Sequence, residues 1–148
     1  MFQIESFEAF HIVGLALRTR NAEAFETIPP HWARFHGENV LARVTNRLSD
    51  EVHAVYTEFE NEDRSNEGLY TLLIGVPVAS LAVVPDGLRG ITVPAARRAV
   101  FPVERGRTDL VGAEWQKIWR LTELPKSYRC EHERYRANGD IDICVGLR

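Results

Sequence analysis

Runs of hydrophobic residues along the chain predict a series of β-strands. Residues 10–17 (FHIVGLAL) are apolar on both faces and rich in branched side chains, which is typical of a short central strand. Residues 52–59 and 69–78 predict two more strands, joined by the polar loop ENEDRSNEG. Further strands are expected over residues 91–93, 98–103, 128–136 and 141–147.

Two helices are expected between these strands. The first begins near Thr27, a suitable N-cap residue followed by prolines in the first turn, and it places Trp32 and Phe35 on one face. The second runs over residues 108–122, because a proline shortly after Thr122 prevents its continuation. Each helix therefore follows one strand and precedes two others.

The order of these elements repeats along the chain. Residues 1–80 and 88–148 each read strand, helix, strand, strand, and a connector rich in proline and glycine separates them. We therefore predict one α+β domain over residues 1–148, built from two pseudo-symmetric βαββ repeats. It is expected to have antiparallel sheets, helices packed on one side of them and a ligand cleft at the seam between the repeats.

The last two predicted strands flank Asn138 and Gly139, a strong signal for a two-residue β-turn. Such a turn pairs Tyr135 with Asp142 and Glu133 with Cys144. Because side chains alternate between the faces of a sheet, Glu133 then lies among small residues, on the face opposite the isoleucines of the last strand. Space for a ligand is expected above it.

A carboxylate in such a recess needs a positive partner, because an isolated buried charge is very costly. The partner is either a ligand cation or one of the sixteen arginines. A carboxylate beside aromatic rings suits an aromatic cation, through charge pairing, stacking and cation–π attraction. Trp32, Tyr56 and Trp115 are aromatic residues of the predicted helices and strands that could supply such rings.

Composition and motifs narrow the class of function. A formal net charge of −3 and a pI of about 6.0 lack the basic surplus of a nucleic-acid binder. No apolar run approaches the ~20 residues of a membrane span, and the first residues carry no signal-peptide pattern, so we expect a cytoplasmic protein without a membrane partner. Zinc-site spacings, nucleotide-binding loops and nucleophile motifs are also missing, so no metal or cofactor is predicted.

The chain resembles the GyrI-like, or AraC-type effector-binding, family of multidrug-sensing domains over nearly its whole length. The resemblance rests on the order and spacing of several segments: VYTEFE at 55–60, YTLLIGVPV at 70–78, ITVPA at 91–95, AVF at 99–101, the tryptophans at 115 and 119, HERY at 132–135 and DIDI at 140–143. It implies a pair of βαββ repeats with a ligand cleft between them.

In the resembled family, the glutamate that matches Glu133 lies at the base of the cleft and meets cationic, often aromatic, ligands. We expect four aromatic residues to border the same cleft: Tyr135, Trp115, Tyr56 and Trp32. The sequence departs from the family at Arg98, where an aromatic residue is common. If Arg98 reached the cleft, it would neutralise Glu133 and favour neutral or anionic ligands.

We predict a standalone binding domain for cationic, amphipathic drug-like molecules, acting as a ligand sensor or sequestering protein; no DNA-binding segment precedes its first strand. Two alternatives stay open. Some similar proteins hydrolyse reactive cyclopropane-bearing compounds, and in that case Glu133 would be the general base. A gyrase-inhibitor-like protein would instead act on a protein partner, and its cleft would be incidental.

Overall fold

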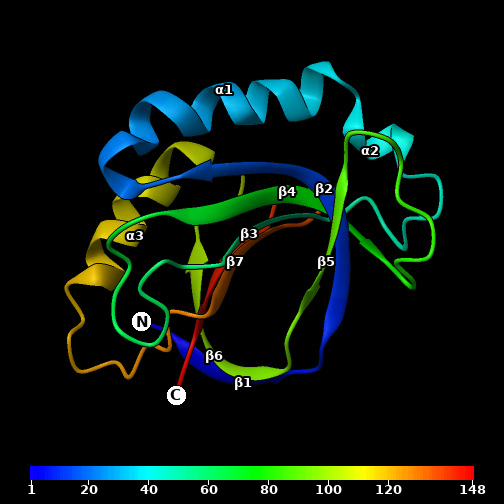
Figure 1. Ribbon diagram of the computed structural model, residues 1–148. Coiled ribbons are helices and arrows are strands. Elements are labelled where there is room, and N and C mark those ends of the chain that lie inside the picture. The colour runs from blue at the N-terminus through cyan, green and yellow to red at the C-terminus, as the bar shows by residue number, and fades with distance from the viewer.

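The computed structural model describes residues 1–148 (Figure 1). Short 3₁₀ turns over Asn21–Glu23 and Thr108–Leu110 precede the two longer helices. The strands and α-helices, in chain order, are β1 (Gln3–Phe7), β2 (Phe10–Thr19), α1 (Ala24–Gly37), α2 (Val40–Arg43), β3 (Val52–Thr57), β4 (Tyr70–Val78), β5 (Arg89–Val93), β6 (Ala96–Val103), α3 (Val111–Trp119), β7 (Cys130–Tyr135) and β8 (Ile141–Gly146).

All eight strands form one antiparallel sheet in the order β1-β6-β8-β7-β3-β4-β2-β5. If β1 is exchanged with β5, β2 with β6, β3 with β7 and β4 with β8, the same order results, read backwards. Two βαββ repeats predict this symmetry. The edge strands are exchanged between the halves, because β1 pairs with β6 and β5 pairs with β2. The α+β class and the antiparallel pairing are confirmed, and the strands of both halves form one sheet, continuous through the pairing of β3 with β7.

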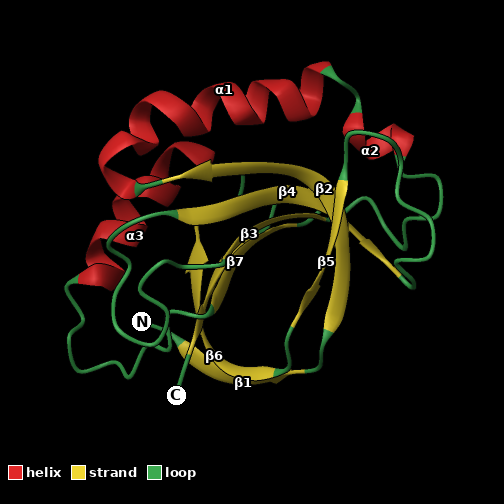
Figure 2. Cartoon of the chain, in the orientation of Figure 1, coloured by secondary structure: helices red, strands yellow, loops and turns green.

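Both longer helices cover the same face of the sheet (Figure 2). Under α3 lies a hydrophobic cluster that includes Trp115, Ile118 and Ile143, and under α1 lies a second cluster that includes Phe35 and Leu72. Tyr56 and Tyr135 pack against both clusters. These two tyrosines therefore mark the seam between the halves on the helix-covered face.

The helix boundaries differ from those predicted. Helix α1 begins at Ala24, so Pro29 and Pro30 lie inside it rather than in its first turn. The carbonyls that lose a hydrogen bond belong to Phe25 and Glu26, which are exposed, so water can replace the missing donors. Helix α3 is shorter than predicted, because its first expected turn is 3₁₀ and its last expected residues are turns. None of the helices has the length and hydrophobicity that a bilayer crossing would need.

The predicted register of the last hairpin is wrong by one residue. Arg136 and Asp140 close a three-residue loop, in which the Gly139 amide donates to the Arg136 carbonyl at 2.9 Å. Gly139 has φ +95°, whereas Asn138 lacks the positive φ that a type I′ turn requires. Glu133 consequently pairs with Ile143. It lies on the face that carries the isoleucines and the helices, not among the small residues.

The sheet is strongly curved (Figure 1). Its other face also carries buried side chains. A smaller apolar cluster there includes Ile12, Val55 and Leu73. His132 lies on the same side, in edge contact with Phe7 and Phe10 at ring-centroid distances of 5.5 and 5.4 Å. The molecule therefore has two buried layers, one on each face of the sheet, and Glu133 belongs to the layer under the helices.

Candidate functional site

Glu133 is a buried carboxylate in the middle of the sheet. It lies on β7 between Ala54 of β3 and Ile143 of β8, and its exposed fraction is 2%. The strand alternation directs it towards the helices, at the seam that Tyr56 and Tyr135 mark. The small side chain of Ala54 on one side leaves the glutamate side chain room to extend over the sheet.

Three aromatic side chains donate hydrogen bonds to this carboxylate. The Tyr56 hydroxyl and the Trp115 indole Nε1 both donate to Oε2, at 2.6 and 2.7 Å, and the Tyr135 hydroxyl donates to Oε1 at 2.5 Å. The donors come from β3, α3 and β7, so the carboxylate joins both halves of the molecule. All three are neutral, and none of the ion pairs in the protein includes Glu133.

The titration of this cluster follows from burial and from the carboxylate. Burial raises the pKa of Glu133, and the three hydrogen bonds oppose that shift. Burial, together with the charge of Glu133, raises the pKa of Tyr56 and of Tyr135 well above the ordinary value and raises the pKa of Tyr70 to about 12. The tyrosines therefore remain protonated donors at neutral pH.

Aromatic rings surround the three donors. Tyr56 packs edge-on against Trp115 and Tyr70, each at a centroid distance of 5.6 Å. On the α1 side, the Trp32 ring meets the Tyr135 ring edge-on at 5.2 Å. The structure thus brings together all five residues that we predicted for the site, although Trp32 reaches Glu133 only through Tyr135.

Sequence reasoning missed two aromatic neighbours of this cluster. Tyr70 is the first residue of β4, which pairs with β3. It lies two residues before the partner of Tyr56, so the alternation of side chains along a strand places both tyrosines on one face. Trp119 follows Trp115 by four residues on α3, a spacing that places both on one helix face, and their ring centroids are 6.3 Å apart. Trp119 is 40% exposed, so it extends the aromatic surface from the buried site to the solvent.

Arg98 does not reach Glu133. In β6 it lies opposite Gly146 of β8, on the face of the sheet away from the helices. It is fully buried there and donates a hydrogen bond to the Pro94 carbonyl at 3.0 Å. Arg98 therefore does not neutralise Glu133, because the two side chains lie on opposite faces of the sheet.

A second buried acid shares the strand and the face of Glu133. Glu131 lies opposite Tyr56 in the β3–β7 pairing and is 6% exposed. Burial raises the pKa of Glu131 to about 7, although Lys126 and Arg98 lower it. Two buried carboxylates therefore lie two residues apart on this face of β7, and neither forms an ion pair.

A comparison with protein families shows to which family the chain belongs. The family model for Cass2, described as integron-associated effector binding protein, matches residues 3–146. The chain belongs to this family. As a Cass2-type protein it is an effector-binding domain, and the GyrI-like resemblance seen in the sequence is confirmed. A search of curated protein sequences finds no match.

Solved structures share the fold at low sequence identity. The integron cassette protein VCH_CASS2 of Vibrio cholerae has a TM-score of 0.78 and 17% identity, and the alignment covers 99% of this chain and 95% of that protein. SAV2435, solved bound to tetraphenylphosphonium, has a TM-score of 0.82 and 15% identity, with 100% and 94% of the two chains covered. At these identities the likeness establishes the common fold.

Proposed function

We propose that this Cass2-type protein binds a small aromatic cation at Glu133 and acts as a ligand sensor or sequestering protein. The observation that carries the proposal is the buried carboxylate of Glu133, which has three aromatic hydrogen-bond donors and no cationic partner. Tyr56, Trp115, Tyr135 and Trp32 are proposed as the aromatic side chains that contact the ligand.

Electrostatics explains why such a site selects a cation. Hydrogen bonds from the two tyrosines and from Trp115 stabilise the carboxylate but leave its net charge uncompensated, and a buried uncompensated charge destabilises the free protein. A cation that replaces one donor cancels this charge in a region from which water is excluded. The surrounding rings add cation–π and stacking contacts of ~0.5–2 kcal/mol each.

The SAV2435 structure supports this class of ligand. Its bound tetraphenylphosphonium combines one positive charge with four phenyl groups, and SAV2435 shares the fold of this chain over its full length. A carboxylate in contact with three aromatic side chains, with the Trp32 ring beside one of them, has the chemistry that recognises such a molecule. The proposal for this chain rests on its own residues, since the identity of the two proteins is 15%.

The closed geometry adds a requirement for movement. Glu133 is 2% exposed, and its donors occupy both carboxylate oxygens. A ligand can therefore contact the carboxylate only after at least one of the donor side chains moves away. We propose that Trp115 moves, because it lies on the nine-residue helix α3, whereas the two tyrosines lie in strands of the sheet. Its displacement would couple ligand binding to the position of α3.

Two ions of the same shape and opposite charge test the proposed function. Tetraphenylphosphonium and tetraphenylborate would each be titrated into the protein by isothermal calorimetry at constant ionic strength, with tryptophan fluorescence recorded in parallel. We expect the phosphonium ion to bind and to change the fluorescence of Trp115, and the borate ion not to bind. Equal binding of both ions, or binding of neither, would contradict the proposal.

Cyclopropane hydrolysis and gyrase inhibition stay predictions, and no contact in the structure favours either over cation binding. Hydrolysis would require Glu133 to contact water, which the three donors now exclude. Incubation with an electrophilic cyclopropane compound, followed by mass spectrometry of the products, tests the first alternative. A pulldown with purified gyrase tests the second.

A further inference from the structure

A cavity of about 520 Å³ lies apart from the Glu133 cluster, and none of the five predicted site residues lines it. Its wall comes from segments that are distant in the sequence: the β5–β6 connection with the start of β6 (94–98), the end of the preceding loop with the first residue of β7 (127–130), and residues 147–148, with Asp63 from the β3–β4 loop. Its volume is in the range of small-molecule sites.

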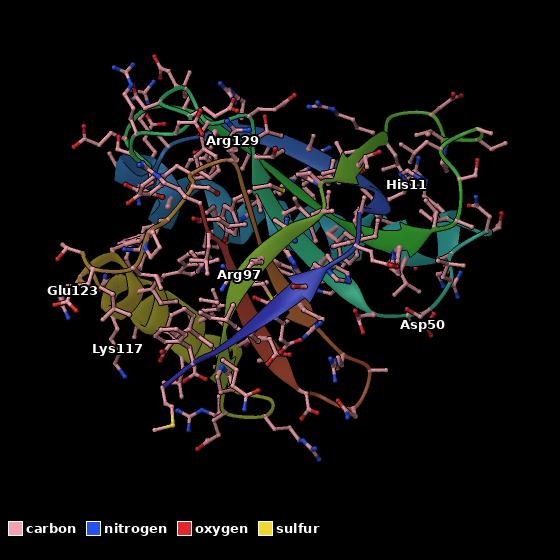
Figure 3. All side chains as sticks on the ribbon, turned by 90° about the horizontal axis from the view of Figure 1, so that it is seen from below. His11, Asp50, Arg97, Lys117, Glu123 and Arg129 are labelled. Carbon is pink, nitrogen blue, oxygen red and sulfur yellow. The ribbon has the colours of Figure 1, made fainter.

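The charge of this cavity is strongly positive. Three arginines line it, Arg98, Arg129 and Arg148, against the single acid Asp63. Arg129, which lies at the surface beside the start of β7 in Figure 3, donates to both carboxylate oxygens of Asp63. Arg148 donates only to the backbone carbonyls of Asp63 and Lys126. Asp63 therefore neutralises one arginine and leaves two without a carboxylate partner.

Arg98 is the most unusual of these residues. Its exposed fraction is 0%, and its Nε and Nη1 groups have no hydrogen-bond partner. The Phe7 ring, 5.3 Å from the guanidinium carbon, provides a cation–π contact but no acceptor for these N–H groups. A buried guanidinium with unfilled donors is costly, so an acceptor that fills them would stabilise the fold.

No anionic side chain of the protein accepts a hydrogen bond from Arg98. Burial raises the pKa of Cys130 to about 11 and that of Cys144 to about 12, so both thiols are neutral at neutral pH. Glu131 does not accept from the Arg98 N–H groups either. It forms neither an ion pair nor a hydrogen bond with Arg98, and it projects from the helix-covered face of β7. The Arg98 guanidinium therefore has no anionic group of the protein in direct contact, although the charge of Glu131 acts on it from a distance.

We propose that this cavity binds a small organic anion through a carboxylate or phosphate group, with Arg98 as the principal partner and Arg148 at the rim. Arg98 itself lines the cavity, and its Nη2 donates to the carbonyl of Pro94, which also lines it. The planar fork of an arginine matches two oxygens of a carboxylate or phosphate group. The protein would then hold a cation and an anion at two separate sites.

Three probes of similar size test this site at constant ionic strength: benzoate, phenyl phosphate and neutral benzamide. Binding would be measured by calorimetry and by thermal denaturation, on the wild-type protein, Arg98→Met and Glu133→Gln. We expect at least one of the two anions to bind the wild type and Glu133→Gln alike, and to bind Arg98→Met at least tenfold more weakly. Binding of benzoate alone identifies a carboxylate site, and binding of phenyl phosphate alone a phosphate site.

The free Arg98→Met protein should melt at a higher temperature than the wild type, because an unpaired buried charge is replaced by an apolar side chain of similar length. Should that variant fail to fold, Arg148→Gln changes an exposed residue of the same cavity and is expected to weaken anion binding several-fold. Anions that bind no better than benzamide, or that bind all variants equally, would overturn the proposal. Because Glu133→Gln retains the anion site, failure here is separable from failure of cation binding.

Discussion

The indole Nε1 of Trp115 donates a hydrogen bond to Oε2 of Glu133 across 2.7 Å, and this contact connects α3 to the centre of the sheet. Tyr56 donates to the same oxygen from β3. Two aromatic residues that are 59 positions apart thus share one carboxylate oxygen of a third element. The stability of the free protein and its ability to admit a ligand both depend on this arrangement.

Replacing Trp115 by phenylalanine removes the donor and keeps an aromatic ring. We expect Trp115→Phe to lower the free energy of unfolding by about 1–3 kcal/mol, because a buried charged acceptor loses one of its donors. Trp119→Phe is the matched control, since Trp119 is 40% exposed and makes no such bond; its effect should be about 0.5 kcal/mol or less. Urea denaturation measures both, and equal losses would show that the hydrogen bond is not responsible.

Glu131 predicts a pH dependence of stability. Burial raises its pKa to about 7 in the folded protein, against an ordinary value of 4.5. Between these values the folded protein retains a proton that the unfolded chain has released, so this group lowers the free energy of unfolding as the pH rises from about 4.5 to about 7. Its contribution is constant above that window.

Glu131→Gln removes this dependence. The variant should match the wild type at pH 4 and exceed its free energy of unfolding by roughly 3 kcal/mol at pH 8, because the wild type must then keep a buried charge. Denaturation of both proteins at the two pH values measures the difference and cancels the effect of the other acids. A difference that does not change with pH would contradict the burial of an ionisable Glu131.

The close approach of β2 and β4 at two facing glycines predicts that a side chain added there destabilises the protein. Gly14 of β2 faces Gly75 of β4, and a Cβ atom added at Gly75 would lie 2.3 Å from the Val13 carbonyl oxygen. Since that neighbour is backbone, Gly75→Ala should destabilise the fold by more than about 3 kcal/mol or prevent folding. Gly112→Ala on α3 is the control, because its Cβ meets nothing within 4 Å.

We expect Gly112→Ala to be neutral or to stabilise the protein by up to about 1 kcal/mol, because alanine has the higher helix propensity. Thermal denaturation and soluble expression of the two variants provide the comparison. Comparable stability of Gly75→Ala and the wild type would mean that β2 and β4 approach each other less closely than the structure shows.

The α+β class could be predicted from the sequence because it depends on local periodicity, whereas the five candidate site residues are expected from the family resemblance. The strand alternation around Tyr56 and Glu133, and the helical spacing of Trp115, are local signals that survive in the folded protein. The register of the last hairpin, in contrast, does not follow from local periodicity. Asn138-Gly139 is compatible with a two-residue turn and with a three-residue loop, and contacts distant in the sequence select between them.

The loop that forms places Glu133 under Tyr56 and Trp115, where its carboxylate finds three donors. Strand β1 escaped prediction for a related reason: four of its five residues are exposed, so its sequence has no buried face, and it is held by pairing with β6. The orientation of Arg98 away from the site likewise follows from its pairing with β8. Strand pairing over long distances is what the periodicity of a single segment cannot specify.

Glu133→Gln tests the central claim most directly, because glutamine keeps the shape of the side chain and removes its charge. The free protein should change in stability by only about 1 kcal/mol, since the tyrosine hydroxyls can rotate to accept from the new amide group while the cost of the buried charge disappears. The complex with a cation instead loses a desolvated charge pair, an effect of about 2–5 kcal/mol.

The decisive measurement is therefore the dissociation constant of tetraphenylphosphonium for the wild type and for Glu133→Gln, obtained by calorimetry beside the melting temperature of each protein. The account predicts binding that is weakened by at least about 30-fold, with little change in melting temperature. A Glu133→Gln protein that melts at a much lower temperature yet binds the cation as tightly as the wild type would contradict it.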